Sequence, residues 1–373
     1  MFERPLVLGV TKVLTPASIP VTDALSMLGR NSGNLLFTEA LYQCIANAEF
    51  SHYDVRPSTV EGRDCIVIAA ANWLASDQDF SWLSDQLEQV DLPVFIVGLG
   101  VQTTLEQTIP KLKPGTRKLL DILNERSKYI SVRGQFTAEV LEHYGINKAV
   151  VTGCPSLLLA GGKGFSIETP SSLSQEKICV HGTRHQFNDT DEFQKYIYRQ
   201  AFTRGIDIIL QSELADMYYA LGRTGNDAVL QKAAPPLLAS YGASQVSDIA
   251  IYLRRHGKVF FDLPTWLNYL KSRSFCVGTR IHGTIAALLA GVPGTLIVHD
   301  ARTKELAEAM SIPFRLASTI DTSKDIIFND LYDGEQTDQF VQSYPAYLSR
   351  FRSFFSDNDL LISQHLTLAA HPV

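Results

Sequence analysis

The sequence contains no apolar run long enough to cross a lipid bilayer. A membrane-spanning helix needs about 18 or more predominantly apolar residues in succession, and no stretch of this chain approaches that length. The N-terminus carries Glu3 and Arg4 directly ahead of a short apolar run, which is not the pattern of a secretory signal peptide. These absences predict a cytoplasmic protein without a membrane span.

Cysteine is scarce and is scattered along the chain. The five cysteines are Cys44, Cys65, Cys154, Cys179 and Cys276. None of them stands in Cys-x-x-Cys spacing, and no group of histidines, carboxylates or cysteines has the spacing of metal ligands. Cysteines inside apolar runs are typical of small, reduced core residues in a cytoplasmic protein. We therefore expect neither disulfides nor a bound metal.

An excess of positive charge is also missing. The 33 lysines and arginines are outnumbered by 39 carboxylates, which gives a formal net charge of −6. No global basic field is available to attract nucleic acid or an anionic membrane, so we expect neither as a partner. An anionic ligand would therefore need a local basic pocket in a mildly acidic protein.

Several enzyme motifs are absent. The segment 161–164 reads Gly-Gly-Lys-Gly and lacks the Gly-Lys-Ser/Thr of a phosphate-binding loop. No Gly-x-Ser-x-Gly of the hydrolases is present. Cys154 stands in Gly-Cys-Pro-Ser, and because a nucleophilic cysteine needs a histidine base beside it, the sequence favours a structural turn there.

Apolar runs rich in β-forming residues alternate with helical patterns along the chain. This alternation is typical of a doubly wound, largely parallel sheet, and 373 residues suffice for two such domains. The expected strands are Leu6–Val10, Cys65–Ala71, Pro93–Gly98, Tyr129–Val132, Ala149–Thr152, Lys177–His181, Ile206–Leu210, Val259–Phe261, Phe275–Val277 and Thr295–Val298. The fold class is therefore α/β.

Composition also predicts the domain limits. The segment 161–175 is rich in glycine, serine and proline and is the best linker. We expect an N-terminal domain over 1–165, a C-terminal domain over 176–330 and a helical segment over 331–373. The helix Phe340–Phe355 is expected to pack back across the first domain. Residues 11–33 are expected to form a loop or lid, and Ala233–Val246, with its two prolines, an irregular or short helical region.

The most informative stretch is 274–313. A buried strand is followed by Gly278-Thr279-Arg280-Ile281-His282-Gly283, and a helix of small residues is expected to begin near Thr284. Free N–H groups and the helix dipole favour an anion at such a helix N-terminus. Arg280 can bind a carboxylate or phosphate through two parallel N–H bonds. The alternative is structural: Arg280 caps a sheet edge and His282 is a satisfied, partly buried histidine.

Further polar residues follow expected strands, where an open α/β sheet holds its ligand. These residues are Arg133, Arg184, Arg302 and Lys304, with His181 and His299 beside them. The turn Gly29-Arg30-Asn31-Ser32-Gly33-Asn34 leads into a helix and is a weak signal for a phosphate cradle; a simple tight turn is the alternative.

The order of elements across 274–313 resembles the polysaccharide pyruvyl transferase family. Members of that family have a strand, Gly-x-Arg-x-His-Gly, a helix of small residues, Ala-Gly-Val-Pro, and then a second strand and helix, and all of these stand here in order. Segments 31–34 and 131–133 also resemble the family, although Asn34 and Gly134 replace residues that are more usually acidic. The resemblance implies two Rossmann-like domains facing across a cleft, the arrangement called GT-B.

The resemblance also implies a reaction. A pyruvyl group would pass from phosphoenolpyruvate to sugar hydroxyls as a cyclic ketal during surface polysaccharide biosynthesis, with no cofactor beyond phosphoenolpyruvate as co-substrate. The acceptor would be a sugar, an oligosaccharide or a lipid-linked saccharide. Such a donor needs two cationic sites and one acid, and His282, with an ordinary pKa near 6.5, can supply a proton near neutral pH.

The resemblance implies these roles for Arg280, for the backbone of Ile281 and for His282, and it extends less directly to Arg184. Together with the placement of the other residues, it gives the following expected site. The catalytic residues are His282 and Arg280; the donor is bound by Arg280, Ile281, Gly283, Arg184, Arg302 and Lys304; the acceptor is bound by Asn31, Gly33, Asn34 and Arg133.

Two other functions fit the same residues. A nucleotide-sugar glycosyltransferase of the same fold would use Arg280 and His282 to hold the donor diphosphate. A non-catalytic sugar-binding relative would keep the fold without turnover. Fold analogy alone does not separate these functions from pyruvyl transfer.

Overall fold

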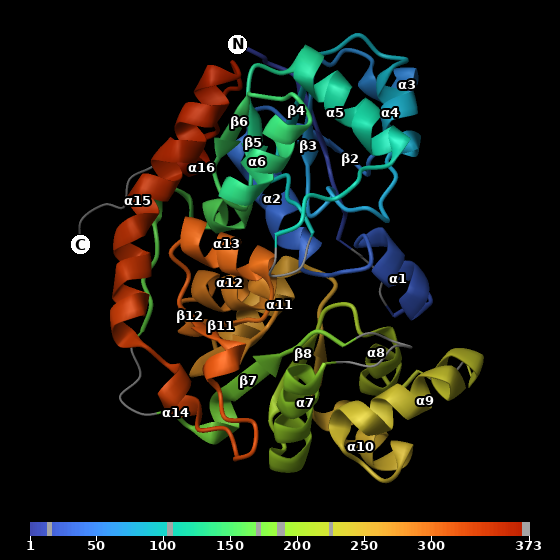
Figure 1. The fold of residues 1–373 in the computed structure, drawn as a ribbon, viewed down its shortest axis with the longest axis vertical. Helices are drawn as coiled ribbons and strands as arrows, with labels where there is room; N and C mark the ends of the chain where they lie inside the picture. The colour runs from blue at the N-terminus through green and yellow to red at the C-terminus, as the bar shows by residue number, and fades with distance from the viewer. Residues whose placement is uncertain (13–16, 103–106, 169–172, 185–190, 224–226, 368–373) are drawn as a thin grey trace.

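Two parallel β-sheets form the centre of the computed structural model (Figure 1). It describes residues 1–12, 17–102, 107–168, 173–184, 191–223 and 227–367. The first sheet has the strand order β2-β1-β3-β4, and the second has the order β12-β11-β10-β7-β8-β9. Every strand pair in the two sheets is parallel. The α/β prediction, with two Rossmann-like units in the GT-B arrangement, is confirmed.

The first sheet is built from short strands, of which β1, β3 and β4 are buried and the edge strand β2 is partly exposed. They are β1 (Pro5–Leu8), β2 (Glu49–Ser51), β3 (Cys65–Ala69) and β4 (Val94–Val97), followed by the separate pair β5 (Ile130–Val132) and β6 (Ala149–Val151). Helices α1 (Val21–Met27), α2 (Asn34–Cys44), α3 (Pro57–Val60), α4 (Ser81–Leu87), α5 (Pro114–Arg126) and α6 (Gln135–His143) connect them, and η1 (Pro155–Lys163) follows β6. All five residues of β3 are buried, as expected of a parallel strand covered on both faces.

The residues after Gly98 connect the pair β5–β6 to the first sheet. Gly98 follows β4 with a φ of +75°, a conformation that favours glycine. The next residue, Leu99, pairs with Val132 in a parallel bridge. The Leu99 N–H donates to the Ser131 carbonyl at 3.0 Å, and the Arg133 N–H donates to the Leu99 carbonyl at 2.9 Å. The sheet therefore continues past β4, and this continuation places Arg133 beside the end of β4.

The second sheet carries the motif stretch at its centre. Its strands are β7 (Ile178–His181), β8 (Asp207–Leu210), β9 (Gly257–Val259), β10 (Phe275–Gly278), β11 (Gly294–Val298) and β12 (Phe314–Leu316). Its helices are α7 (Glu192–Arg204), α8 (Leu214–Ala220), α9 (Asp227–Tyr241), α10 (Val246–His256), α11 (Leu263–Leu270), α12 (Ile281–Leu289) and α13 (Ala301–Ala309), with the 3₁₀ turns η2 (Gln175–Lys177) and η3 (Ala317–Thr319). Strand β10 lies between β7 and β11.

The C-terminal segment packs back on the first half of the chain, as predicted. After α14 (Phe328–Leu331), α15 (Gly334–Asp357) runs along one side of the molecule past both sheets, and α16 (Gln364–Thr367) follows (Figure 1). The Tyr347 hydroxyl donates to the Cys154 carbonyl at 2.5 Å. The backbone N–H of Tyr129 donates to the Asn358 side chain at 3.0 Å.

Three local expectations were wrong. The region 11–33 is not only a loop, because α1 forms within it. The region Ala233–Val246 is largely helical: α9 continues through Pro235 and Pro236 and buries Leu237 and Tyr241. Buried apolar side chains on one helix face outweigh the low helix propensity of proline here. Helix α12 begins at Ile281 rather than Thr284, so Ile281 and His282 form its first turn.

The remaining expectations from the sequence concern the domain limits, the cysteines and membrane-spanning helices. Residues 169–172 of the predicted linker lie outside the described residues, and the domain limits stay a prediction. All five cysteines are free and buried. No helix among the described residues combines the length and the hydropathy that a bilayer-spanning helix needs.

The aromatic face of α15 offers a test of its contribution to stability. Phe351 is fully buried between the rings of Tyr347 and Phe355, at centroid distances of 5.1 and 5.9 Å. We expect Phe351→Ala to lower the free energy of unfolding by about 3–5 kcal/mol, since it leaves a cavity. Urea unfolding measures the change. The exposed Ile251 in α10 gives the control Ile251→Ala, expected within about 0.5 kcal/mol of wild type; equal losses in both variants would contradict the prediction.

Candidate functional site

A cavity of about 450 Å³ lies at the carboxyl ends of strands from both sheets. Its lining residues include Asn72, Arg133, Arg184, Gln211, Arg280 and His299, which follow β3, β5, β7, β8, β10 and β11 respectively. Residues from the loop before α2 and from the first turn of α12 complete the lining. Ligands of open α/β sheets bind at this edge, so the cavity is the candidate functional site.

Two glycines allow β10 and α12 to pack closely against His181 of β7. A Cβ atom on Gly278 would lie 1.7 Å from the His181 carbonyl oxygen, and one on Gly283 would lie 2.5 Å from the His181 ring. His181 is fully buried, and its Nδ1 accepts the backbone N–H of Arg280 at 3.1 Å. This packing fixes the turn at Arg280 and leaves the first-turn N–H groups of Ile281 and His282 outside the hydrogen-bond ladder of α12.

The loop before α2 closes the cavity from the other half of the chain. The Ser32 N–H donates to the Gln211 carbonyl at 2.9 Å. A Cβ atom on Gly33 would lie 2.8 Å from both the Gln211 side chain and the His282 Cβ. Gly33 therefore permits a close approach of α2 to α12 that a larger residue would prevent.

Two of the cavity arginines are neutralised by buried carboxylates. Arg184 and Asp216 form an ion pair in which both side chains are fully buried. Arg280 pairs with the buried Glu213 and also donates through its Nε to the Gly182 carbonyl at 2.8 Å. Burial alone would raise the pKa of Glu213, but Arg280 and backbone N–H bonds hold it below its ordinary value. Glu213 therefore stays ionised and compensates the charge of Arg280.

Arg302 shares a carboxylate with a histidine. Its guanidinium lies 3.2 Å from Asp300, and His299 lies 3.8 Å from the same carboxylate. Asp300 also caps α13 by accepting the Thr303 N–H at 2.7 Å. The Arg302 Nε and the His299 Nδ1 are buried and have no hydrogen-bond partner among the described residues. Buried polar atoms without a partner are costly, so a ligand with acceptor oxygens would satisfy them.

Arg133 differs from the other three arginines because it has no ion-pair partner among the described carboxylates. It is only 2% exposed, and it donates to three neutral oxygens: those of Gly98 at 2.8 Å, Ala70 at 3.1 Å and the Asn72 side chain at 3.1 Å. Its guanidinium also lies 5.7 Å from the centre of the Phe37 ring. Burial lowers its pKa, but an arginine stays charged in a protein. The cavity therefore contains a buried positive charge that an anion can neutralise.

His282 lies beside these cations and is only 7% exposed. Burial, followed by the charges of Arg133, Arg302 and Arg280, lowers the pKa of His282 well below its ordinary value. The imidazole is therefore neutral at neutral pH when no anion is bound. This corrects the expectation of a pKa near 6.5 for the unliganded protein.

Cys154 has the neighbouring histidine that sequence alone did not reveal. Its Sγ lies 3.5 Å from the His282 Nε2 and 3.1 Å from the Ser156 hydroxyl. Cys154 is fully buried and does not line the cavity. A substrate in the cavity would not reach its sulfur, so the thiol orients the imidazole rather than attacking a substrate.

Comparison with protein-family models identifies this arrangement of residues. The model described as "Polysaccharide pyruvyl transferase" matches residues 31–301, which include the loop before α2, Arg133 and the first turn of α12. The chain belongs to the polysaccharide pyruvyl transferase family. Comparison with curated proteins gave no significant match.

Solved structures with overall similarity are distant. A UDP complex of MnaA from S. aureus is 10% identical, with a TM-score of 0.44, and the match covers 93% of this chain and 97% of that one. A putative UDP-N-acetylglucosamine 2-epimerase from Listeria monocytogenes is 12% identical, with a TM-score of 0.44, and covers 91% and 90%. The glycosyltransferase of kitacinnamycin is 11% identical, with a TM-score of 0.41, and covers 96% and 99%.

The structure of this family member brings most of the expected site residues together. Arg133, Arg184, Arg280, Ile281, His282, Arg302, Asn31 and Asn34 line one cavity. Lys304 does not line it; its side chain is half exposed and lies 3.7 Å from Glu308. Gly33 and Gly283 lie behind the lining, where they permit close packing. The division into donor and acceptor residues stays a prediction.

Sequence reasoning missed the neutral and acidic members of the site. Gln211 lines the cavity, and its buried Nε2 has no hydrogen-bond partner among the described residues. Asn72, Glu213 and Asp216 were also missed. The position of Gln211 directly after β8 could have indicated it. Glu213 and Asp216 carry no such signal, because only their ion pairs with Arg280 and Arg184 in the folded protein connect them to the site.

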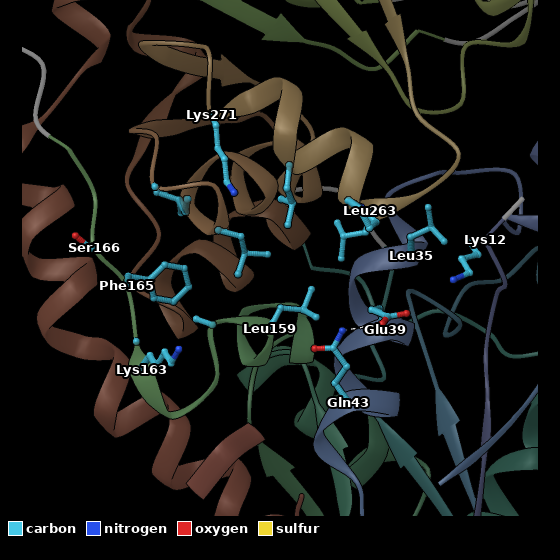
Figure 2. A pocket seen from close by; sticks show the side chains of 17 residues that line it. Lys12, Leu35, Glu39, Gln43, Leu159, Lys163, Phe165, Ser166, Leu263 and Lys271 are labelled. Atoms are coloured by element: carbon cyan, nitrogen blue, oxygen red, sulfur yellow. Dashed lines mark hydrogen bonds between the residues drawn. The ribbon is translucent and has the colours of Figure 1, made fainter. Parts of the chain in front are cut away.

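A larger cavity of about 720 Å³ lies elsewhere in the molecule (Figure 2). Its lining is largely apolar, with Leu35, Leu159, Phe165 and Leu263 from both halves of the chain, and no arginine or histidine of the described residues lines it. Its charged lining residues are Lys12, Lys163, Lys271 and Glu39, which do not include the forked arginine side chains and the histidine of the first cavity, so it is not the candidate site. Among the described residues, no group of three or more histidines, cysteines or carboxylates could hold a metal ion.

Arg133 can be tested with a simple anion. A ligand that binds only the folded state stabilises it by about 2.7 kcal/mol at 100 times its dissociation constant. We expect inorganic phosphate to raise the melting temperature of the wild type, and we expect Arg133→Gln to lose most of this increase. Thermal unfolding in a phosphate-free buffer, with and without added phosphate, measures the difference.

The control for this measurement is Arg350→Gln, because Arg350 is an exposed arginine that also donates to a carbonyl, that of Ala309. This variant should respond to phosphate as the wild type does. An unchanged phosphate response in Arg133→Gln would show that Arg133 does not bind the anion.

The pKa of His282 predicts a pH dependence of stability. A pKa that is lower in the folded than in the unfolded state gives stability that is present above about pH 6.5 and lost as the pH falls. The loss approaches about 1.4 kcal/mol per pH unit. We expect the free energy of unfolding of wild type to fall more between about pH 7 and 5 than that of His282→Gln. Urea unfolding at each pH tests this, and parallel curves would contradict it.

Proposed function

We propose that this protein transfers a pyruvyl group from phosphoenolpyruvate to two hydroxyls of a saccharide, forming a cyclic ketal. The observation that carries the proposal is the buried Arg133, a cation without a carboxylate partner among the described residues, next to a histidine in the same cavity. The family membership supports the same reaction. The five free cysteines support a cytoplasmic location.

The donor carries a carboxylate and a phosphate, and the cavity offers two groups of donors for them. Arg133, which the sequence led us to expect at the acceptor, is reassigned to the donor because it supplies the uncompensated charge. Arg302, Gln211 and the first-turn N–H groups of α12 supply further donors, of which the Arg302 Nε and the Gln211 Nε2 have no described partner. Arg280, already paired with Glu213, contributes a charge that is largely compensated. An anion therefore gains most from Arg133 and from the unpartnered N–H groups.

Binding of the donor would also raise the pKa of His282, so that the imidazole can act as the acid. The negative charges of the donor offset Arg133, Arg302 and Arg280, which are the charges that lower the pKa of His282. The pKa of His282 then rises, and the imidazole takes up a proton. His282 gives that proton to the methylene carbon of phosphoenolpyruvate, which becomes a methyl group, and the adjacent carbon gains cationic character.

The acceptor then adds in two steps. One sugar hydroxyl bonds to the cationic carbon, the phosphate group leaves with its bonding electron pair, and a second hydroxyl of the same saccharide closes the ketal. Asn34 lies in the cavity wall, where its Nδ2 donates to the carbonyls of Leu28 and Gly29 at 3.0 and 3.2 Å. Its Oδ1 is then available to accept a hydrogen bond from a hydroxyl. An amide orients that hydroxyl without removing its proton. Of the two hydroxyl protons released, one replaces the proton that His282 gave to the methylene carbon, and the other leaves with the phosphate.

The variant His282→Gln tests this assignment. Removing a general acid typically lowers the rate by about 10²–10⁴-fold. We expect phosphate release from phosphoenolpyruvate with a saccharide acceptor to fall in this range, while phosphoenolpyruvate affinity falls much less, since Arg133 and the α12 N-terminus remain. The control is His143→Gln, at an exposed histidine, with unchanged turnover.

Parallel binding experiments with a nucleotide sugar separate this function from glycosyl transfer. We expect phosphoenolpyruvate, and not UDP-glucose, to raise the melting temperature of the wild type. Turnover of well-folded His282→Gln at the wild-type rate would refute the acid role. Stabilisation by UDP-glucose alone would refute pyruvyl transfer and favour a glycosyltransferase.

A further inference from the structure

Another cavity, different from the one in Figure 2, adjoins the arginine-lined site. It has a volume of about 730 Å³ and shares Gly29, Asn34, Ala71 and Trp73 with the site already described. The shared residues form a common wall, so a ligand that spans both cavities would pass Asn34. The volume lies within the range of small-molecule pockets. None of the site residues expected from the sequence, apart from Asn34, lines this second cavity.

Aromatic rings form one side of this cavity. Trp73 and Phe80 are stacked, with ring centroids 4.5 Å apart and an interplanar angle of 25°. The ring of Tyr53 meets Trp73 at 5.9 Å and Trp82 edge-on at 6.1 Å. Trp82 is 46% exposed. Exposed aromatic surface that gathers in a hollow next to a reaction site marks a binding surface.

The surrounding contacts hold these rings in place. Tyr53 has a φ of +50°, a conformation rarely adopted by a large side chain, and its hydroxyl donates to the Ala69 carbonyl at 2.6 Å. Gln86 donates to the Trp82 carbonyl at 3.0 Å and accepts the Val55 N–H at 3.2 Å. The aromatic surface is therefore positioned before any ligand arrives.

Polar groups lie among the aromatic rings. Asp54 and Arg56 form an ion pair with three N–O contacts of 2.6 to 3.0 Å. His52, Gln86 and Gln89 also line the cavity. A purely apolar ligand could form no further hydrogen bonds with these groups. A ligand that combines an apolar face with a ring of hydroxyl groups would satisfy both kinds of surface.

We propose that this aromatic cavity, defined by Tyr53, Trp73, Phe80 and Trp82, binds the acceptor as an oligosaccharide of at least two sugar units. The terminal sugar lies at the shared wall, where Asn34 meets the hydroxyls that receive the pyruvyl group. The next sugar lays the C–H face of its ring on Trp82, and its hydroxyls meet Asp54, Arg56 and Gln89. This inference rests on the proposed function for the position of the reacting sugar, but saccharide binding itself requires no donor.

Direct binding without phosphoenolpyruvate tests the proposal. The probes are cellobiose, lactose and N,N′-diacetylchitobiose, each compared with its constituent monosaccharides, and saturation-transfer NMR and tryptophan fluorescence measure affinity. We expect wild type to bind at least one disaccharide about tenfold or more tightly than the monosaccharides. Trp82→Ala should weaken that binding at least about tenfold, as for an aromatic residue that contributes strongly to binding. Trp82→Phe, which keeps an aromatic face, should retain most of it.

The matched control is Tyr129→Ala, because Tyr129 is a similarly exposed aromatic (42%) outside both cavities. It should bind the disaccharide as wild type does. Failure of all three disaccharides to bind the wild type, or equal binding to wild type and Trp82→Ala, would overturn the proposal. Binding of UDP that depends on Trp82, without binding of any disaccharide, would also overturn it, because the cavity would then hold a nucleobase.

The same variant distinguishes this proposal from the proposed function. We expect Trp82→Ala to keep the thermal stabilisation by phosphoenolpyruvate, since Trp82 does not line the arginine cavity. If phosphoenolpyruvate does not stabilise even the wild type, while disaccharide binding still depends on Trp82, pyruvyl transfer fails and the saccharide site stands. If phosphoenolpyruvate binds and no disaccharide does, the saccharide site alone fails.

Discussion

The site depends on one buried positive charge, that of Arg133. Its guanidinium is held by neutral oxygens, whereas Arg184, Arg280 and Arg302 each lie against a carboxylate. Desolvation makes a buried charge costly unless an opposite charge accompanies it. Arg133 lines a cavity and is not sealed in the core, so a bound anion can offset the desolvation cost of its charge. Arg133 therefore supplies the strongest reason in the structure to expect an anionic ligand.

The cavity exists only because the two halves of the chain approach closely. Gly33 allows the N-terminus of α2 to reach His282. Glu305, from α13, crosses to the other half and accepts the Thr137 N–H at 3.1 Å, and a Cβ atom on Gly134 would overlap its side chain. The sequence showed Gly134 where a carboxylate is more usual, and the structure places one there from another part of the chain. This contact could not be predicted from sequence, because Glu305 lies 168 residues from Thr137.

The sequence predicted the parts of the site that follow from local pattern. Strand-end placement identified Arg133, Arg280 and His282, because the carboxyl ends of parallel strands meet at one edge. It did not predict that Arg280 pairs with Glu213, 67 residues earlier in the chain, so it assigned Arg280 more free charge than it has. The helix α9 was missed for a related reason: burial of Leu237 and Tyr241 against other helices outweighs two prolines, and burial is not a local property.

These electrostatics also connect donor binding to proton transfer in the proposed reaction. The imidazole of His282 is neutral because burial and three arginines lower its pKa. A neutral sugar brings no charge and leaves that pKa low, whereas a donor with a carboxylate and a phosphate opposes the arginines and raises it. The acid would therefore form in the donor complex and not in the complex with the acceptor alone. An acid that forms only with its substrate present needs no separate switch, because the substrate's own charge creates it.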